Sequence, residues 1–80
     1  MDDAQIVQRI DELVAEEHSL ERDHGEEPLG VDELARLRQV EEQLDQCWDL
    51  LRRRRARRNA GGDPDDVQAR PTDTVEHYRQ

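Results

Sequence analysis

Glu21 and His24 stand three residues apart in this 80-residue chain, and they form the first pattern that could hold a metal ion. Di-iron carboxylate bundles use this spacing on helices, and Glu17 lies about one turn before the pair. Those bundles also need a His from a facing helix, but residues 32–60 contain none. We therefore keep Glu17, Glu21 and His24 only as weak metal-ligand candidates, favour a solvated acidic face, and predict no cofactor.

Two other side chains are of types that catalysis uses: His18 as an acid or base, and Cys47 as a nucleophile. The sequence pairs His18 with no activated nucleophile, oxyanion-binding loop or pocket-forming element. Cys47 lies beside Trp48 in a helical stretch, and acidic neighbours such as the flanking aspartates disfavour a reactive thiolate. We predict that Cys47 is a packed structural thiol and that the protein is not an enzyme.

The arginine cluster, defined as the sequence RRRRARR at residues 52–58, is the patch with the most functional promise. Arginine binds carboxylates and phosphates through paired hydrogen bonds. Three interpretations stay open: the cluster neutralises acids elsewhere in the chain, it docks on a protein partner, or it binds the phosphates of a nucleic acid or ribosome. The candidate partner-binding residues are Arg53, Arg54, Arg57, Arg58 and Tyr78.

The net charge of −9 is unevenly distributed along the chain, and every one of the 12 basic residues is Arg. Residues 1–51 carry 16 acids and 4 arginines, whereas residues 52–60 carry 6 arginines and no acid. Residues 61–80 again have an acidic balance, with 5 acids and 2 arginines. This acidity outside the cluster makes nucleic acid the less favoured partner.

Composition excludes three classes of protein. No apolar run approaches the ~18–20 residues of a membrane span, and the acidic N-terminus lacks the pattern of a signal peptide. The single Cys47 can form no intrachain disulfide and cannot supply a cysteine-based zinc site by itself. We expect a small cytoplasmic protein, and not a membrane protein, a disulfide scaffold or a zinc finger.

The first predicted element is an amphipathic helix over residues 3–24, followed by a turn at 25–31. Asp2 and Gln5 have the spacing of a capping box, which satisfies free N–H groups at a helix start. Apolar residues then recur at steps of three and four, as a helix with one buried face requires. They are Ile6, Ile10, Leu13, Val14 and Leu20, with Val7 at the edge.

A second helix is predicted over residues 32–60, where the sequence Asn-Ala-Gly-Gly at 59–62 ends it. Its apolar residues follow the a and d positions of a heptad. This predicted seam consists of Leu34, Leu37, Leu44, Trp48 and Leu51, flanked by Val40 and Cys47.

A short turn between two long helices predicts an antiparallel, coiled-coil-like hairpin. The apolar register places Ile10 near Leu44, and it brings Asp3 alongside the start of the arginine cluster, so that opposite charges meet. Glu17 and Glu41 occupy seam positions where Leu is expected. Either they form a buried ion pair with Arg9, Arg36 or Arg38, or they turn outward at the edge, which we favour.

Residues 61–80 form a tail that we assign to the same unit as the hairpin at 1–60. Asp63 and Pro64 are residue types that are typical of the start of a helix, and Pro71 limits that helix to a short turn. Two interpretations of the tail are open: it docks on a neighbouring groove through Val67, Val75 and Tyr78, or it is solvated.

One hairpin offers a single shared seam, which is little apolar area for some fifty ordered residues. Trp48 also widens the apolar surface beyond what one partner helix covers. We therefore predict a homodimer with two-fold symmetry that forms a four-helix bundle. Its self-association seam is predicted to contain Ile6, Ile10, Leu13, Leu20, Leu34, Leu37, Leu44, Trp48 and Leu51.

A resemblance to known proteins is carried by the string LDQCWDLLRRRRA at residues 44–56, together with Asp63–Pro64, Arg70–Pro71 and VEHY at 75–78. Through these residues the chain resembles a family of small actinobacterial proteins of unknown function. The start agrees as well, at Ile6, Arg9, Ile10, Leu13, Val14, Leu20 and the EEH at 16–18. Arginine without any lysine also fits a genome rich in G and C. The resemblance implies that the tail belongs to the unit, but it implies no activity and carries no functional residues.

These observations favour a noncatalytic helical interaction protein that self-associates and docks on a cytoplasmic partner. The alternative is a factor associated with nucleic acid or the ribosome through the arginine cluster. Binding to phosphates weakens steeply with salt, which separates the two hypotheses.

Overall fold

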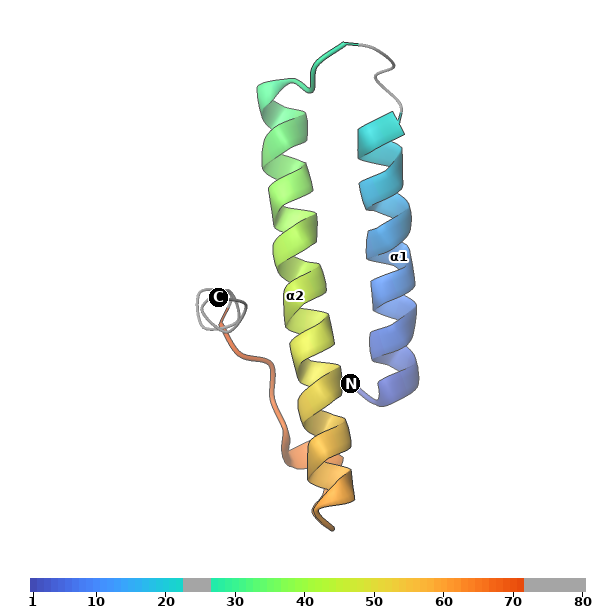
Figure 1. Ribbon diagram of the computed structural model, residues 1–80, viewed down its shortest axis with the longest axis vertical. Coiled ribbons are helices and arrows are strands. Elements are labelled where there is room, and N and C mark those ends of the chain that lie inside the picture. The colour runs from blue at the N-terminus through green and yellow to red at the C-terminus, as the bar shows by residue number, and fades with distance from the viewer. Residues whose placement is uncertain (23–26, 72–80) are drawn as a thin grey trace.

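Two helices form an antiparallel hairpin in the computed structural model, which describes residues 1–22 and 27–71 (Figure 1). Helix α1 spans Asp3–Arg22, helix α2 spans Val31–Asn59, and a short 3-10 helix, η1, follows at Pro64–Asp66. The all-α hairpin predicted from the sequence is therefore confirmed. The bounds of α2 differ by one residue at each end from those predicted, whereas residues 23–26 lie outside the described part.

The start of α1 is fixed by the predicted capping box. The Gln5 backbone N–H donates to Asp2 Oδ1 at 2.8 Å, and the Asp2 N–H donates to Gln5 Oε1 at 2.9 Å. At the start of α2, the Gly30 N–H donates to Glu33 Oε1 at 3.2 Å. These side chains satisfy N–H groups that the first turn of a helix leaves without an intrahelical acceptor.

The end of α2 depends on a glycine with a positive φ. Gly61 has a φ of 85°, a conformation that residues with a Cβ rarely adopt. The Gly61 N–H donates to the Arg58 carbonyl at 3.0 Å, and the Gly62 N–H donates to the Arg57 carbonyl at 2.9 Å. This pair of bonds is the Schellman motif, which satisfies the last carbonyls and turns the chain back.

The core lies between the helices and extends under the segment after α2. Its buried apolar residues are Ile6, Ile10, Leu13, Val40, Leu44, Leu50 and Leu51. Val14, Leu20, Cys47 and Val67 pack against them and are partly buried. The heptad seam of α2 needs correction, because Val40 and Leu50 are in this core whereas Leu34 and Trp48 are 51% and 45% exposed. Leu37 is half-buried.

Side-chain contacts between α1 and α2 hold the predicted antiparallel register. Arg9 Nη2 donates to Gln43 Oε1 at 2.9 Å near the middle of the hairpin. At the end where α1 begins, Arg54 Nε donates to Asp3 Oδ1 at 2.7 Å. The acidic start of α1 therefore meets the basic end of α2, as expected from the charge distribution.

The chain after α2 folds back along that helix (Figure 1). Asp63 caps η1 by accepting from the Asp65 N–H at 2.9 Å. Farther along, Gln46 Nε2 donates to the Arg70 carbonyl at 3.2 Å, and Val67 packs on the core. The tail is thus docked over its described part, whereas the predicted contacts of Val75 and Tyr78 lie outside the described residues.

In the described part of the chain, neither α1 nor α2 is long and apolar enough to cross a membrane.

Candidate functional site

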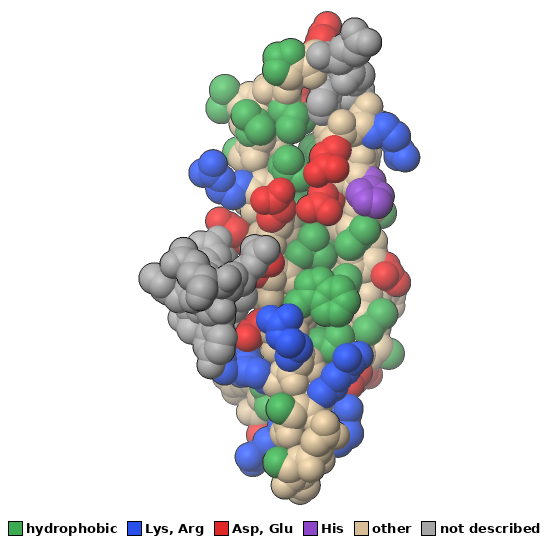
Figure 2. Space-filling model, viewed as in Figure 1, with side chains coloured by type: hydrophobic (Ala, Val, Ile, Leu, Met, Phe, Trp, Pro, Cys, Tyr) green, Lys and Arg blue, Asp and Glu red, His purple; other side chains and the backbone are tan. Residues whose placement is uncertain are grey.

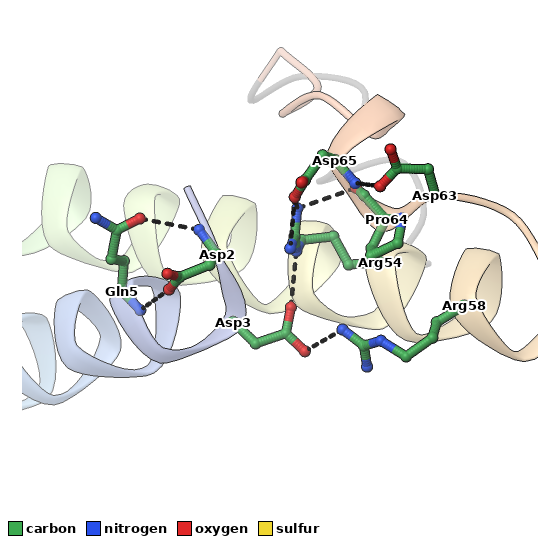
Figure 3. A network of polar contacts seen from close by, with 8 residues as sticks. All are labelled: Asp2, Asp3, Gln5, Arg54, Arg58, Asp63, Pro64 and Asp65. Carbon is green, nitrogen blue, oxygen red and sulfur yellow. Dashed lines mark hydrogen bonds and ion pairs between the residues drawn. The ribbon is translucent and has the colours of Figure 1, made fainter.

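Arg54 lies at the junction of three chain segments (Figure 3), and only 4% of its surface is exposed. Its Nε donates to Asp3 at the start of α1, while Nη1 and Nη2 each donate to Asp65 Oδ1 at 3.1 Å. Nη1 also donates to the Pro64 carbonyl at 3.0 Å. The guanidinium therefore joins α1, α2 and η1, and it is not available to an outside partner.

The charges at this junction stabilise one another. Hydrogen bonds from Arg54 and then Arg58 lower the pKa of Asp3 below its ordinary value. In return, the hydrogen bond to Asp3 raises the pKa of Arg54. Arg58 Nη2 reaches the second oxygen of the same carboxylate at 2.7 Å. Asp3 is thus held ionised by two residues of the arginine cluster.

The remaining candidate arginines are also paired within the chain. Arg53 Nε donates at 3.0 Å to Asp49, a buried carboxylate, and Arg53 also donates to the carbonyl of Gln68. Arg57 Nη2 lies 3.8 Å from Asp66. The side chains of Arg57 and Arg58 nevertheless stay about half exposed, at 51% and 49%. Tyr78, the last candidate for partner binding, lies outside the described residues.

Two arginines of the cluster were not among the candidates from the sequence, and these two have no such pairs within the described part of the chain. Arg52 and Arg55 are exposed, and neither makes an ion pair with the described residues. Both lie on the side of α2 that carries Trp48, at spacings of four and seven residues. Their spacing from Trp48 could have identified these two arginines in the sequence. Periodicity alone, however, does not reveal which side of α2 the rest of the chain covers.

A groove of about 470 Å³ opens beside Trp48 between the two helices. Its walls are formed by Glu17 from α1 and by Glu41, Leu44, Asp45 and Trp48 from α2. Glu41 is exposed and Glu17 half-buried, and neither forms an ion pair with the described residues. Of the two interpretations of these seam glutamates, the outward one is therefore correct.

An ion pair between the helices does form at this level of the hairpin, but through a different glutamate, Glu16. Arg36 donates from Nε and Nη2 to the two oxygens of Glu16, the second bond measuring 2.7 Å. This two-bond contact lowers the pKa of Glu16 and raises that of Arg36. It links α1 to α2 at the edge of the seam, and Glu17 and Glu41 in the groove have no cation as a partner within residues 1–22 and 27–71.

A family model described as protein of unknown function (DUF2630) matches residues 2–80. The chain belongs to this family. Uncharacterized proteins of Mycobacterium bovis and Mycobacterium tuberculosis are each 47% identical to it over 81 residues, covering 95% of this chain and 88% of theirs. No solved structure matches the chain. The resemblance to a family of unknown function is therefore confirmed.

The other chemical candidates in this DUF2630 chain are the weak metal-ligand set, His18 and Cys47. Within residues 1–22 and 27–71, no three His, Cys, Asp or Glu side chains gather as metal ligands, and His24 lies outside those ranges. His18 is exposed on α1. Cys47 is half-buried, and burial raises the pKa of its thiol above the ordinary value. Burial, and not the acidic neighbours considered in the sequence analysis, is therefore what raises the pKa of Cys47.

Proposed function

We propose that this DUF2630 protein is a noncatalytic helical interaction protein that self-associates and docks on a partner protein. The observation that carries the proposal is Trp48, which remains 45% exposed in the middle of α2 and beside an open groove. Tryptophan is enriched at the centres of protein interfaces, where burial of its large ring contributes strongly to affinity. An exposed Trp at the centre of a helix face is therefore a feature of binding surfaces.

Self-association is tested by size-exclusion chromatography with light scattering. The chain has a mass of 9.4 kDa, so a homodimer has a mass of about 19 kDa. We expect the dimer in the wild type and a shift toward the monomer for Trp48→Ala. A folded wild-type protein of 9.4 kDa at all concentrations would contradict the proposal.

Docking on a second protein is proposed to use Arg57 and Arg58, which stay half exposed although they are ion-paired. A pull-down from native lysate compares the wild type with Arg57→Glu/Arg58→Glu. Loss of specific partners from the variant supports this role, whereas identical sets of partners remove these arginines from consideration. Arg54→Glu is unsuitable as a probe, because it breaks the junction that Arg54 forms.

The nucleic-acid alternative is weakened by the internal pairs of the arginine cluster. Four of its arginines already bind carboxylates of the same chain, which compete directly with phosphates. We therefore expect no binding of a labelled RNA or DNA duplex at moderate salt. Fluorescence anisotropy checks this, and tight binding that falls steeply with salt would favour the alternative instead.

A further inference from the structure

Trp48 lies at the midpoint of a charged pattern on one face of α2. Glu41 precedes it by seven residues and Arg55 follows it by seven. Seven residues make nearly two helical turns, so the three side chains share a face, with each charge about 10 Å from Trp48 along the axis. The face is therefore acidic on one side of the aromatic residue and basic on the other.

Both charged parts of this face extend beyond a single residue. Glu17 of α1 lines the same groove as Glu41, and Arg52 lies between Trp48 and Arg55. Figure 2 shows acidic side chains above a hydrophobic centre, with arginines below it toward the end of α2. Among the described residues, none of these four charged side chains has an ion-pair partner. They stand out because the neighbouring arginines are paired inside the chain.

We infer that a second copy of the chain covers this face, with the two α2 helices antiparallel and the two-fold axis passing at Trp48. An antiparallel crossing there places Arg55 of each copy against Glu41 of the other. Arg52 of each copy then reaches the groove lined by Glu17. The inference rests on the proposed self-association and specifies its surface and its geometry.

The charge pattern favours this antiparallel arrangement over a parallel pairing of the same face. A parallel crossing at Trp48 sets Glu41 against Glu41 and Arg55 against Arg55, and like charges at an interface are unfavourable. The antiparallel crossing pairs opposite charges at both ends. A two-fold interface requires a surface that is complementary to itself, and this face has that property.

The apolar centre of this face is also suited to a second copy of the chain. The two Trp48 rings meet at the axis, where each covers the exposed part of the other and an aromatic pair can form. The groove of about 470 Å³ beside each ring receives side chains from the far half of the other α2. Arginine is suited to that position, because its aliphatic stem packs on apolar surface while its guanidinium reaches carboxylates.

Charge reversal tests the arrangement directly. Glu41→Arg places a cation against Arg55 of the other copy, and Arg55→Glu places an anion against Glu41 of the other copy, so each variant by itself brings like charges together in its homodimer. We expect the dissociation constant of each homodimer to rise by about tenfold or more, as measured by light scattering over a dilution series. An equimolar mixture of the two variants should form a heterodimer, detected by native mass spectrometry. The combined variant Glu41→Arg/Arg55→Glu should recover the wild-type affinity.

Asp11→Arg is the matched control for Glu41→Arg, because it makes the same change of charge, from −1 to +1, at an exposed site on the outer side of α1. We expect it to dimerise like the wild type, and circular dichroism checks that all variants keep their helices. A wild type that stays monomeric overturns both this inference and the proposed self-association. If the wild type is a dimer but the two charge variants associate as well as Asp11→Arg, this geometry is wrong while self-association stands.

Discussion

Arg54 and Arg55 are neighbours in the sequence but lie in opposite environments. Arg54 is 4% exposed and makes hydrogen bonds to three other residues, whereas Arg55 is exposed and makes no ion pair with the described residues. A step of one residue rotates a side chain by about 100° around a helix. That rotation is enough to move an arginine from an internal junction to an open face.

The apolar residues of α2 show the same contrast. Leu51 and Trp48 both belong to the heptad pattern, yet Leu51 is 1% exposed and Trp48 is 45% exposed. The side of α2 with Leu51 faces α1, and another side is covered by the segment after α2. The side with Trp48 is left open. Helix α2 therefore has a covered part, which holds the hairpin together, and an open face suited to binding.

The largest expected difference between the covered and the open side of α2 is the loss of stability when an apolar side chain is removed. Leu51→Ala removes a fully buried side chain and should lower the free energy of unfolding by about 3 kcal/mol. Trp48→Ala removes a larger but half-exposed side chain, and in dilute monomer it should cost less than about 1 kcal/mol. Urea unfolding followed by circular dichroism measures both. Equal losses for the two variants would show that Trp48 belongs to the folding core.

The next effect compares the two adjacent arginines. Arg54→Met removes the bonds that join α1, α2 and η1, and it should lower the melting temperature by about 5–10 °C. Arg55→Met makes the same chemical change on the open face and should shift the melting temperature by no more than about 2 °C. Thermal melts monitored by circular dichroism provide the measurement. The distinction between the sides fails if Arg55→Met is the more damaging variant.

The smallest expected effect is a loss of folding stability at low pH. Since Arg54 and Arg58 lower the pKa of Asp3 in the folded chain, the unfolded chain takes up this proton at a higher pH. The stabilisation from Asp3 is therefore complete above its unfolded pKa of about 4 and is lost as the pH falls through the lower, folded value.

The urea midpoint of the wild type should decrease as the pH is lowered from 5 to 2.5. Asp3→Asn should have a lower midpoint at pH 5 and a shallower fall toward acid, because the titrating group is gone. Glu16, whose pKa Arg36 lowers, adds a second contribution that stays in the Asp3 variant. An unchanged slope in Asp3→Asn would argue against the ion pairs at this junction.

Local patterns in the sequence predicted the helices and their ends well. Asp2 and Gln5 form the capping box that their spacing indicates, and the glycines after α2 end it in a Schellman motif. These features depend on residues a few positions apart, so the local sequence determines them. The meeting of Asp3 with the arginine cluster also followed from the sequence, because a short turn leaves two long helices one way to pack.

Which side of α2 is covered was decided only by the tertiary structure. The heptad pattern groups Trp48 with Leu51, but a straight helix turns away from a heptad stripe by about 20° per repeat, and α1 follows only part of that stripe. The path of residues 63–71 then determines that Leu50 is buried, that Arg53 also meets the carbonyl of Gln68, and that Arg57 lies near Asp66. The sequence by itself therefore established the hairpin, its caps and the position of its charges. The burial of Arg54 and the exposure of Arg55 depended on contacts between residues distant in the chain, because those contacts decide which side of a helix meets protein and which meets water.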